Sequence, residues 1–379
     1  MEPTRAAGLA RLTAFTPLTG RAYADGRNHD PGPGKPGSVS ALSPFIRHRL
    51  ITEQEVVASA IAAHGAEVAG KFIQEVFWRS YWKGWLAQRP AVWDAYRARV
   101  VAGVGVPPEG YEVAIAGQTG IACFDAWVQE LIETGYLHNH ARMWFASIWI
   151  FTLRLPWFLG ADFFLQHLLD GDAASNTLSW RWVAGLHTKG KHYVARAENI
   201  ARHTGGRFAP HGALNEAPAA LQEPDPPAPR PMPNLPTPPP GPVVLLLHED
   251  DLHPESLPLE GLHVRRVLGL SCPEARSPLG AAQRVRRFVA GAIEDGLRRG
   301  AEHFGVPAEP VALYDLPAIL AREVVVMPET PIGWLADALR PYSILSVRRP
   351  WDTACWPLAA RGFFPFAQHI PRLCDELIG

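Results

Sequence analysis

The chain has 379 residues, enough for two domains of ordinary size, each with a hydrophobic core of its own. Its 36 basic and 37 acidic residues nearly cancel, so overall charge gives no support for a nucleic-acid partner and leaves only a local basic patch for that role. The four cysteines form no zinc-type or CxxC spacing, and the N-terminus lacks an apolar signal segment, so we expect free thiols, no metal and a cytoplasmic protein.

The first half, residues 1–205, is predicted to be helical. A capping box over Thr52–Glu55 opens one helix, and the segments 69–90 and 124–136 repeat apolar residues at helical spacing. The most apolar stretch, 143–169, is interrupted by an arginine, a proline and an aspartate. We therefore expect a buried helix pair there, and no membrane span.

A serine-rich turn precedes another predicted helix start. Ser43 followed by Pro44 is typical of an N-cap and first helical residue. With Ser38 and Ser40, Ser43 brings three hydroxyls toward one helix end, which suits an anion such as a pyrophosphate. An ordinary helix cap is the alternative interpretation.

Residues 168–182, LLDGDAASNTLSWRW, combine two carboxylates, a lone amide and two indoles. Asp170 lies in apolar surroundings, as does Arg142 some thirty positions earlier, and buried charges are normally paired. The two side chains are predicted to form either a structural ion pair or a pair that faces a cofactor.

Residues 206–242 are predicted to be a proline-rich linker. Eleven of the nineteen residues from Pro224 to Pro242 are proline, which excludes helix and central strand. A polyproline-like spacer rises about 3.1 Å per residue, so this one would span up to roughly 60 Å and separate two domains.

The second half, residues 243–379, is predicted to be a smaller α/β domain. Short apolar runs at 242–248, 323–330 and 342–350 have the character of buried strands, and 281–305 has one apolar helical face. Alternating elements of this kind favour a parallel, Rossmann-like sheet.

Four motifs, in order along residues 23–200, resemble the FAD-binding domain of the photolyase/cryptochrome superfamily. They are Tyr23 with Arg27 and Asn28 before SVSALSP, then FIQEVFWRSYW, TGIACFDAWVQELIETGYLHNHARM and DGDAASNTLSWRW. The resemblance implies FAD as cofactor, folded among the helices of a mainly α-helical domain. The residues that it assigns to FAD are Tyr23, Ser38, Ser40, Ser43, Arg79, Arg142, Asp170, Asp172 and Asn176.

Within that set the resemblance implies separate roles. The three serines and Arg79 would hold the pyrophosphate, and Asp170, paired with Arg142, and Asp172 would face the flavin ring and the sugar chain. Asn176 would lie against flavin N5, where a neutral amide stabilises a reduced flavin without supplying a proton.

The resemblance also implies an electron path and a substrate pocket. Trp180 and Trp157 match the first two members of a light-driven electron relay, and Tyr111 is a possible substitute for the missing third tryptophan. The residues that match the pocket for a flipped-out cyclobutane pyrimidine dimer, where Asn176 completes the catalytic set, are Glu75, Trp78, Asn139, Met143 and Trp182.

The α/β half resembles the antenna domain that usually comes first in this superfamily, so the chain is interpreted as circularly permuted; an unrelated α/β domain is the alternative. Glu249 and Asp250 replace the basic residues of the usual first turn, which disfavours an anionic ligand there and suggests a structural role. The antenna pigment is left unspecified.

Two functions follow from the resemblance. The first is light-driven repair of dimer-containing DNA by a carbon–carbon lyase, and the second is a cryptochrome-like photoreceptor with an unidentified protein partner. A flavoprotein that does not use light is a third alternative. A positive rim around the pocket mouth favours repair, and a neutral or acidic rim favours sensing.

Overall fold

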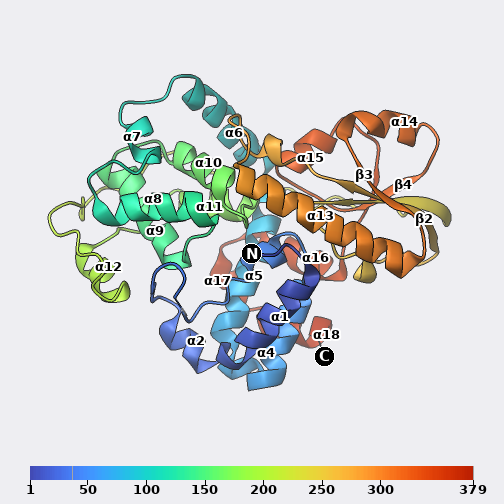
Figure 1. Ribbon diagram of the computed structural model, residues 1–379, viewed down its shortest axis with the longest axis horizontal. Helices are drawn as coiled ribbons and strands as arrows, with labels where there is room; N and C mark the ends of the chain where they lie inside the picture. The colour runs from blue at the N-terminus through green and yellow to red at the C-terminus, as the bar shows by residue number, and fades with distance from the viewer. Residues whose placement is uncertain (36, 379) are drawn as a thin grey trace.

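The computed structural model describes residues 1–35 and 37–378. A helical half and a half built on a parallel sheet lie side by side, with α5 (Gly70–Ala87) running through the middle of the molecule (Figure 1). The predicted fold class is therefore confirmed. Within the described residues no helix combines the length and the apolar character needed to cross a bilayer.

The helical half contains twelve α-helices among the described residues. Their bounds are α1 Arg5–Phe15, α2 Arg21–Gly26, α3 Ser43–Arg47, α4 Glu53–Val68, α5 Gly70–Ala87, α6 Pro90–Gly105, α7 Tyr111–Ile115, α8 Ala122–Thr134, α9 Asn139–Ser147, α10 Trp157–His167, α11 Ala173–Val183 and α12 Ala197–His203. The predicted capping box begins α4: Thr52 accepts from the backbone of Glu55, and the Glu55 side chain accepts from that of Thr52.

The sheet has five parallel strands in the order β3-β2-β1-β4-β5. Their bounds are β1 Gly241–His248, β2 Leu262–Leu270, β3 Ala308–Val311, β4 Val325–Pro328 and β5 Leu345–Val347. The last six residues of β1 and all of β4 are buried, as expected for central parallel strands. Helix α13 (Gln283–Phe304) packs along β1, β2 and β3 and covers one face (Figure 1).

The C-terminal helices belong physically to the helical half. After α14 (Leu316–Leu320) and α15 (Trp334–Leu339), the chain leaves the sheet and forms α16 (Pro350–Cys355), α17 (Phe363–Ala367) and α18 (Ile370–Ile378). These three contact α4 and α5 (Figure 1). The predicted domain of residues 243–379 thus has its last thirty or so residues packed against the other half.

The proline-rich segment contains no helix or strand over residues 219–239, but it does not extend freely as a spacer would. The segment packs on the molecule: Arg230 N donates to Gln88 O at 2.8 Å, and Arg89 Nε donates to Pro227 O at 3.1 Å. Arg348 of the α/β half donates to Pro233 O at 2.9 Å. Because the carbonyls of a proline-rich segment are not paired in a helix or sheet, arginines on both halves can use them as acceptors.

Candidate functional site

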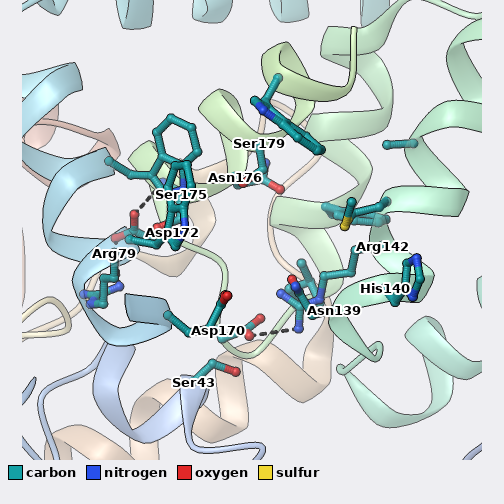
Figure 2. A pocket seen from close by; sticks show the side chains of 18 of the residues that line it. Ser43, Arg79, Asn139, His140, Arg142, Asp170, Asp172, Ser175, Asn176 and Ser179 are labelled. Carbon is teal, nitrogen blue, oxygen red and sulfur yellow. Dashed lines mark hydrogen bonds and ion pairs between the residues drawn. The ribbon is translucent and has the colours of Figure 1, made fainter. Parts of the chain in front are cut away.

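A cavity of about 650 Å³ opens in the helical half, within the usual size of a pocket for a small molecule or cofactor. The predicted site residues that line it are Tyr23, Ser40, Ser43, Glu75, Trp78, Arg79, Asn139, Arg142, Met143, Asp170, Asp172, Asn176, Trp180 and Trp182. Of the remaining predictions, Ser38, Trp157 and Tyr111 are not among its lining residues. Arg79 and Arg142 approach it from different helices, with Asp170 between them (Figure 2).

We call Arg79, Arg142, Asp170, Asp172 and Asn176 the floor of the cavity. Helix α5 supplies Arg79, α9 supplies Arg142, and the loop before α11 supplies the two aspartates. Asn176 lies one turn into α11. The floor therefore depends on three helices and one loop meeting at a single place.

Asp172 is the N-cap of α11 and the centre of a positive cluster. Its Oδ1 accepts from the backbone N–H of Ala174 at 3.1 Å and of Ser175 at 2.8 Å. Its Oδ2 lies 3.5 Å from Arg79, 3.7 Å from Lys83 and 3.9 Å from Arg47. Burial acts to raise the pKa of Asp172, but these three cations outweigh it and hold the pKa well below its ordinary value.

Asp170 is held by Arg142, whose Nη2 donates to Oδ2 at 2.8 Å (Figure 2). The other carboxylate oxygen, Oδ1, is buried and has no partner among the described residues. A buried acceptor without a donor is costly, so a ligand with an N–H group fits this position. FAD, whose ring carries such groups, meets that requirement.

The amide of Asn176 has one orientation that its surroundings allow. Its nearest partner is the carbonyl of Ala161, at 2.7 Å, and a carbonyl only accepts. Nδ2 must therefore face Ala161, which leaves the amide oxygen as an acceptor for the cavity.

The serine-rich turn differs from its prediction. Leu42 occupies the N-cap position of α3, Ser43 is the first helical residue, and no side chain caps this five-residue helix. Ser40 Oγ accepts from Leu42 N at 3.3 Å, and Ser40 and Ser43 line the cavity. Ser38 packs against Gly26 and is not among the lining residues.

We call Arg27, Glu75, Trp78, His140 and Trp182 the mouth of the cavity. Arg27 pairs with Glu75, and both side chains keep about a third of their surface exposed, 29% and 32%. Trp78 stacks on Phe363 of α17 at 3.5 Å between ring centroids, with an interplanar angle of 9°. The C-terminal segment therefore supports one wall of the mouth.

His140, beside Asn139, is neutral. Its Nδ1 donates to Asn28 O at 3.0 Å, so Nε2 accepts from the Tyr193 hydroxyl, also at 3.0 Å. Burial lowers the pKa of His140 to about 4. Around the whole cavity three arginines face three carboxylates: the lining cations are Arg27, Arg79 and Arg142, and the lining anions are Glu75, Asp170 and Asp172.

Two sets of aromatic contacts lie behind the cavity, and the path predicted through Trp157 stays a prediction. Trp180 makes an edge-to-face contact with Trp149, 6.2 Å between centroids, and Trp149 makes another with Tyr111 at 6.0 Å. Trp157 instead stacks on Tyr96 at 5.7 Å. Tyr111, predicted to extend the Trp157 path, thus contacts Trp149, a residue that the sequence reading missed.

Among the residues that line or support the cavity without having been predicted, four show which signals the sequence offers. Lys83 had a usable signal, because it lies one helical turn after Arg79 and two after Glu75. Trp149 sits in a π-helical turn, Ile148–Thr152, for which the sequence has no periodic signal. Arg27 had been noted as part of a motif, and Tyr193 comes from an irregular segment. Within the described residues no cluster of side chains suits a metal ion.

Comparison with known proteins links the cavity to a cofactor. Residues 72–214 match the family model of the FAD binding domain of DNA photolyase. The deoxyribodipyrimidine photo-lyase of Streptomyces griseus is 34% identical over 192 residues, which cover 47% of this chain and 41% of the relative. A deoxyribodipyrimidine photo-lyase of Thermus thermophilus is 33% identical over 192 residues, covering 49% and 43%.

Among solved structures, a class III photolyase from Agrobacterium tumefaciens is similar over 53% of this chain and 43% of that one, with 24% identity and a TM-score of 0.45. The chain therefore spans less than half the length of the curated relatives it matches.

Proposed function

Because the chain belongs to the photolyase/cryptochrome superfamily through an FAD-binding domain, we propose that it is a light-driven enzyme that splits cyclobutane pyrimidine dimers in DNA. Such an enzyme is a carbon–carbon lyase. One observation carries the proposal: the five side chains expected to hold a dimer line the same cavity as the floor that suits FAD. They are Glu75, Trp78, Asn139, Met143 and Trp182.

FAD, when bound, supplies the light absorption and the one-electron chemistry. The chain's own floor would hold and orient it: Arg79 with the hydroxyls of Ser40 and Ser43 faces phosphate, and Asp170 Oδ1 accepts an N–H. Asn176 presents its amide oxygen to the cavity, and this atom accepts a hydrogen bond but cannot donate a proton. This arrangement supports a cofactor that changes charge without being protonated by the protein.

The mouth would hold the flipped-out bases. Indoles of Trp78 and Trp182 offer flat apolar surfaces, and base–aromatic stacking is worth about 1–3 kcal/mol per base. Glu75 would accept hydrogen bonds from a pyrimidine, with Arg27 holding the carboxylate in place. Trp180 would pass electrons to the cofactor, and both aromatic branches behind it remain candidates for resupplying them.

A photoreceptor is the second candidate, and the charge of the site favours it. The three lining arginines balance the three lining carboxylates, and His140 is neutral, so the lining carries no net positive charge for DNA phosphates. Under repair, phosphate contacts would have to come from basic residues outside it, such as those of the segment 189–208.

The deciding experiment is repair of a thymine-dimer oligonucleotide by the fully reduced, FAD-loaded protein under blue light. Loss of dimers that requires light supports the enzyme. Protein that keeps its FAD and leaves the dimers intact would overturn it and give the photoreceptor first place. The exchanged order of the two halves is also part of the proposal, as is location in the cytoplasm.

A further inference from the structure

Residues of both halves hold the back of the loop that carries both floor aspartates. Arg276 Nη1 donates to Leu168 O at 3.1 Å, and Arg47 Nε donates to Gly171 O at 2.7 Å. Beyond these, Gly333 approaches so closely that a Cβ built on it would lie 2.8 Å from that of Ala173, and its φ of +115° also favours glycine. The loop is thus held at its start, middle and end.

The two arginines are themselves anchored at the sheet. Arg47, from α3, pairs with Asp250 at 2.7 Å, and Asp250 also accepts from Thr330 at 2.7 Å. Both guanidinium groups lie over the ring of Trp334, at 5.2 Å for Arg47 and 5.0 Å for Arg276. All of these side chains are buried, with Arg276 at 0% and Arg47 at 1% exposure.

This cluster occupies the place where open parallel sheets ordinarily bind ligands. The strand order reverses direction between β1 and β4, and ligands of such folds lie in the crevice outside the carboxyl ends of strands at that point. Here Asp250 follows β1, Thr330 follows β4 and donates to Asp250, and Arg47 from the helical half pairs with the other oxygen of Asp250. The crevice is packed with the protein's own side chains.

We propose that the carboxyl edge of this sheet positions the loop that carries Asp170 and Asp172 for FAD, instead of binding a ligand of its own. Arg276 and Asp250 are the positioning residues. Arg276 has no partner for Nε or Nη2 among the described residues, so the bond to Leu168 O is what orients its charge. Asp250 holds Arg47 at 2.7 Å, so Arg47 lies 3.9 Å from Asp172, whose nearer cations are Arg79 and Lys83.

The inference rests on FAD binding and is independent of repair, so the test measures affinity for FAD in the full-length apoprotein. Arg276→Met keeps the side-chain length and removes the donor. We expect the Kd for FAD, measured by flavin fluorescence, to rise at least about tenfold, the effect of one lost hydrogen bond from a charged donor. Arg276→Lys should restore part of the affinity. Amide hydrogen exchange over residues 169–175 should speed up in Arg276→Met apoprotein.

Arg299→Met is the matched control. Arg299 is also buried, at 7% exposure, but its side chain donates to Asp295, Glu255 and the carbonyl of Leu252, and among the described residues to none of the loop. It should lower Tm and leave the Kd for FAD and the exchange of the loop unchanged. The proposal would be overturned if Arg276→Met bound FAD with wild-type affinity, or if Arg299→Met weakened FAD binding as much as Arg276→Met does.

If Arg276→Met does not fold, Asp250→Asn takes its place. The variant keeps the shape and releases Arg47 toward Asp172, so a Kd for FAD several-fold above wild type is expected. An unchanged Kd in folded Asp250→Asn protein overturns the proposal in the same way.

Discussion

The floor and the mouth of the cavity hold charge in different ways. On the floor, Asp170 and Asp172 have side chains only 4% exposed, and Asp172 has three cations within 4 Å. At the mouth, Glu75 has one charged partner, and a third of its side chain faces solvent. Removing a partner from a buried charge costs far more than breaking an exposed pair. The floor is therefore tied to stability and cofactor retention, and the mouth is free to serve a substrate.

Asp172→Asn should have the largest effect. Arg47, Arg79 and Lys83 would lose their shared carboxylate, so we expect the free energy of unfolding to fall by about 3–5 kcal/mol and FAD to be lost on purification. Urea unfolding and the flavin-to-protein absorbance ratio measure both effects. A variant that retains wild-type stability and flavin would show that the floor is not held by charge.

The pH dependence of stability tests a residue of the mouth, His140. Burial lowers the pKa of His140 to about 4, whereas an unfolded histidine titrates near 6.5. Between these values the unfolded chain binds more protons, so stability is highest above about pH 6.5 and falls as pH falls toward 4. His140→Asn, which keeps a donor for Asn28 O, should reduce that loss by up to about 1.4 kcal/mol per pH unit. The free energy of unfolding is measured in urea at pH 7, 6 and 5. If it changes equally with pH in wild type and variant, this assignment is contradicted.

Glu75→Gln tests the mouth without disturbing the floor. An ion pair whose side chains are about one third exposed contributes at most about 1 kcal/mol, so Tm and FAD content should stay near wild type. Binding of a thymine-dimer oligonucleotide should weaken about tenfold, because a charged acceptor is replaced by a neutral one. Affinity measured by fluorescence anisotropy gives the answer, and loss of FAD in this variant would place Glu75 on the floor instead.

The smallest structural change distinguishes the two aromatic branches. Tyr111→Phe and Tyr96→Phe each remove one hydroxyl, at the end of the Trp149 branch and of the Trp157 branch. Stability should change by less than about 1 kcal/mol in either variant. We expect flavin bleaching under blue light, with an external thiol as reductant, to slow in Tyr111→Phe and not in Tyr96→Phe. The reverse result would assign the path to Trp157.

Local patterns predicted the elements and many of the residues that meet in the cavity. Helical spacing places Glu75 and Arg79 on one face of α5, whatever surrounds it, and a capping box marks the start of α4 from four residues. The short apolar runs 242–248 and 323–330 contain buried parallel strands. Such features depend on backbone geometry and on the burial of one face, and both follow from the spacing of residue types along the chain.

Partners distant along the chain needed the folded molecule. The sequence contains Arg27 and Glu75, Tyr111 and Trp149, and Arg276 and Leu168, but no spacing rule pairs residues that come from different elements. The same limit explains why the proline-rich segment was expected to stand free: its composition excludes helix and strand, yet says nothing of the arginines that bind its carbonyls. Contacts of this kind arise when whole elements pack, and their energy depends on burial that exists only after the chain has folded.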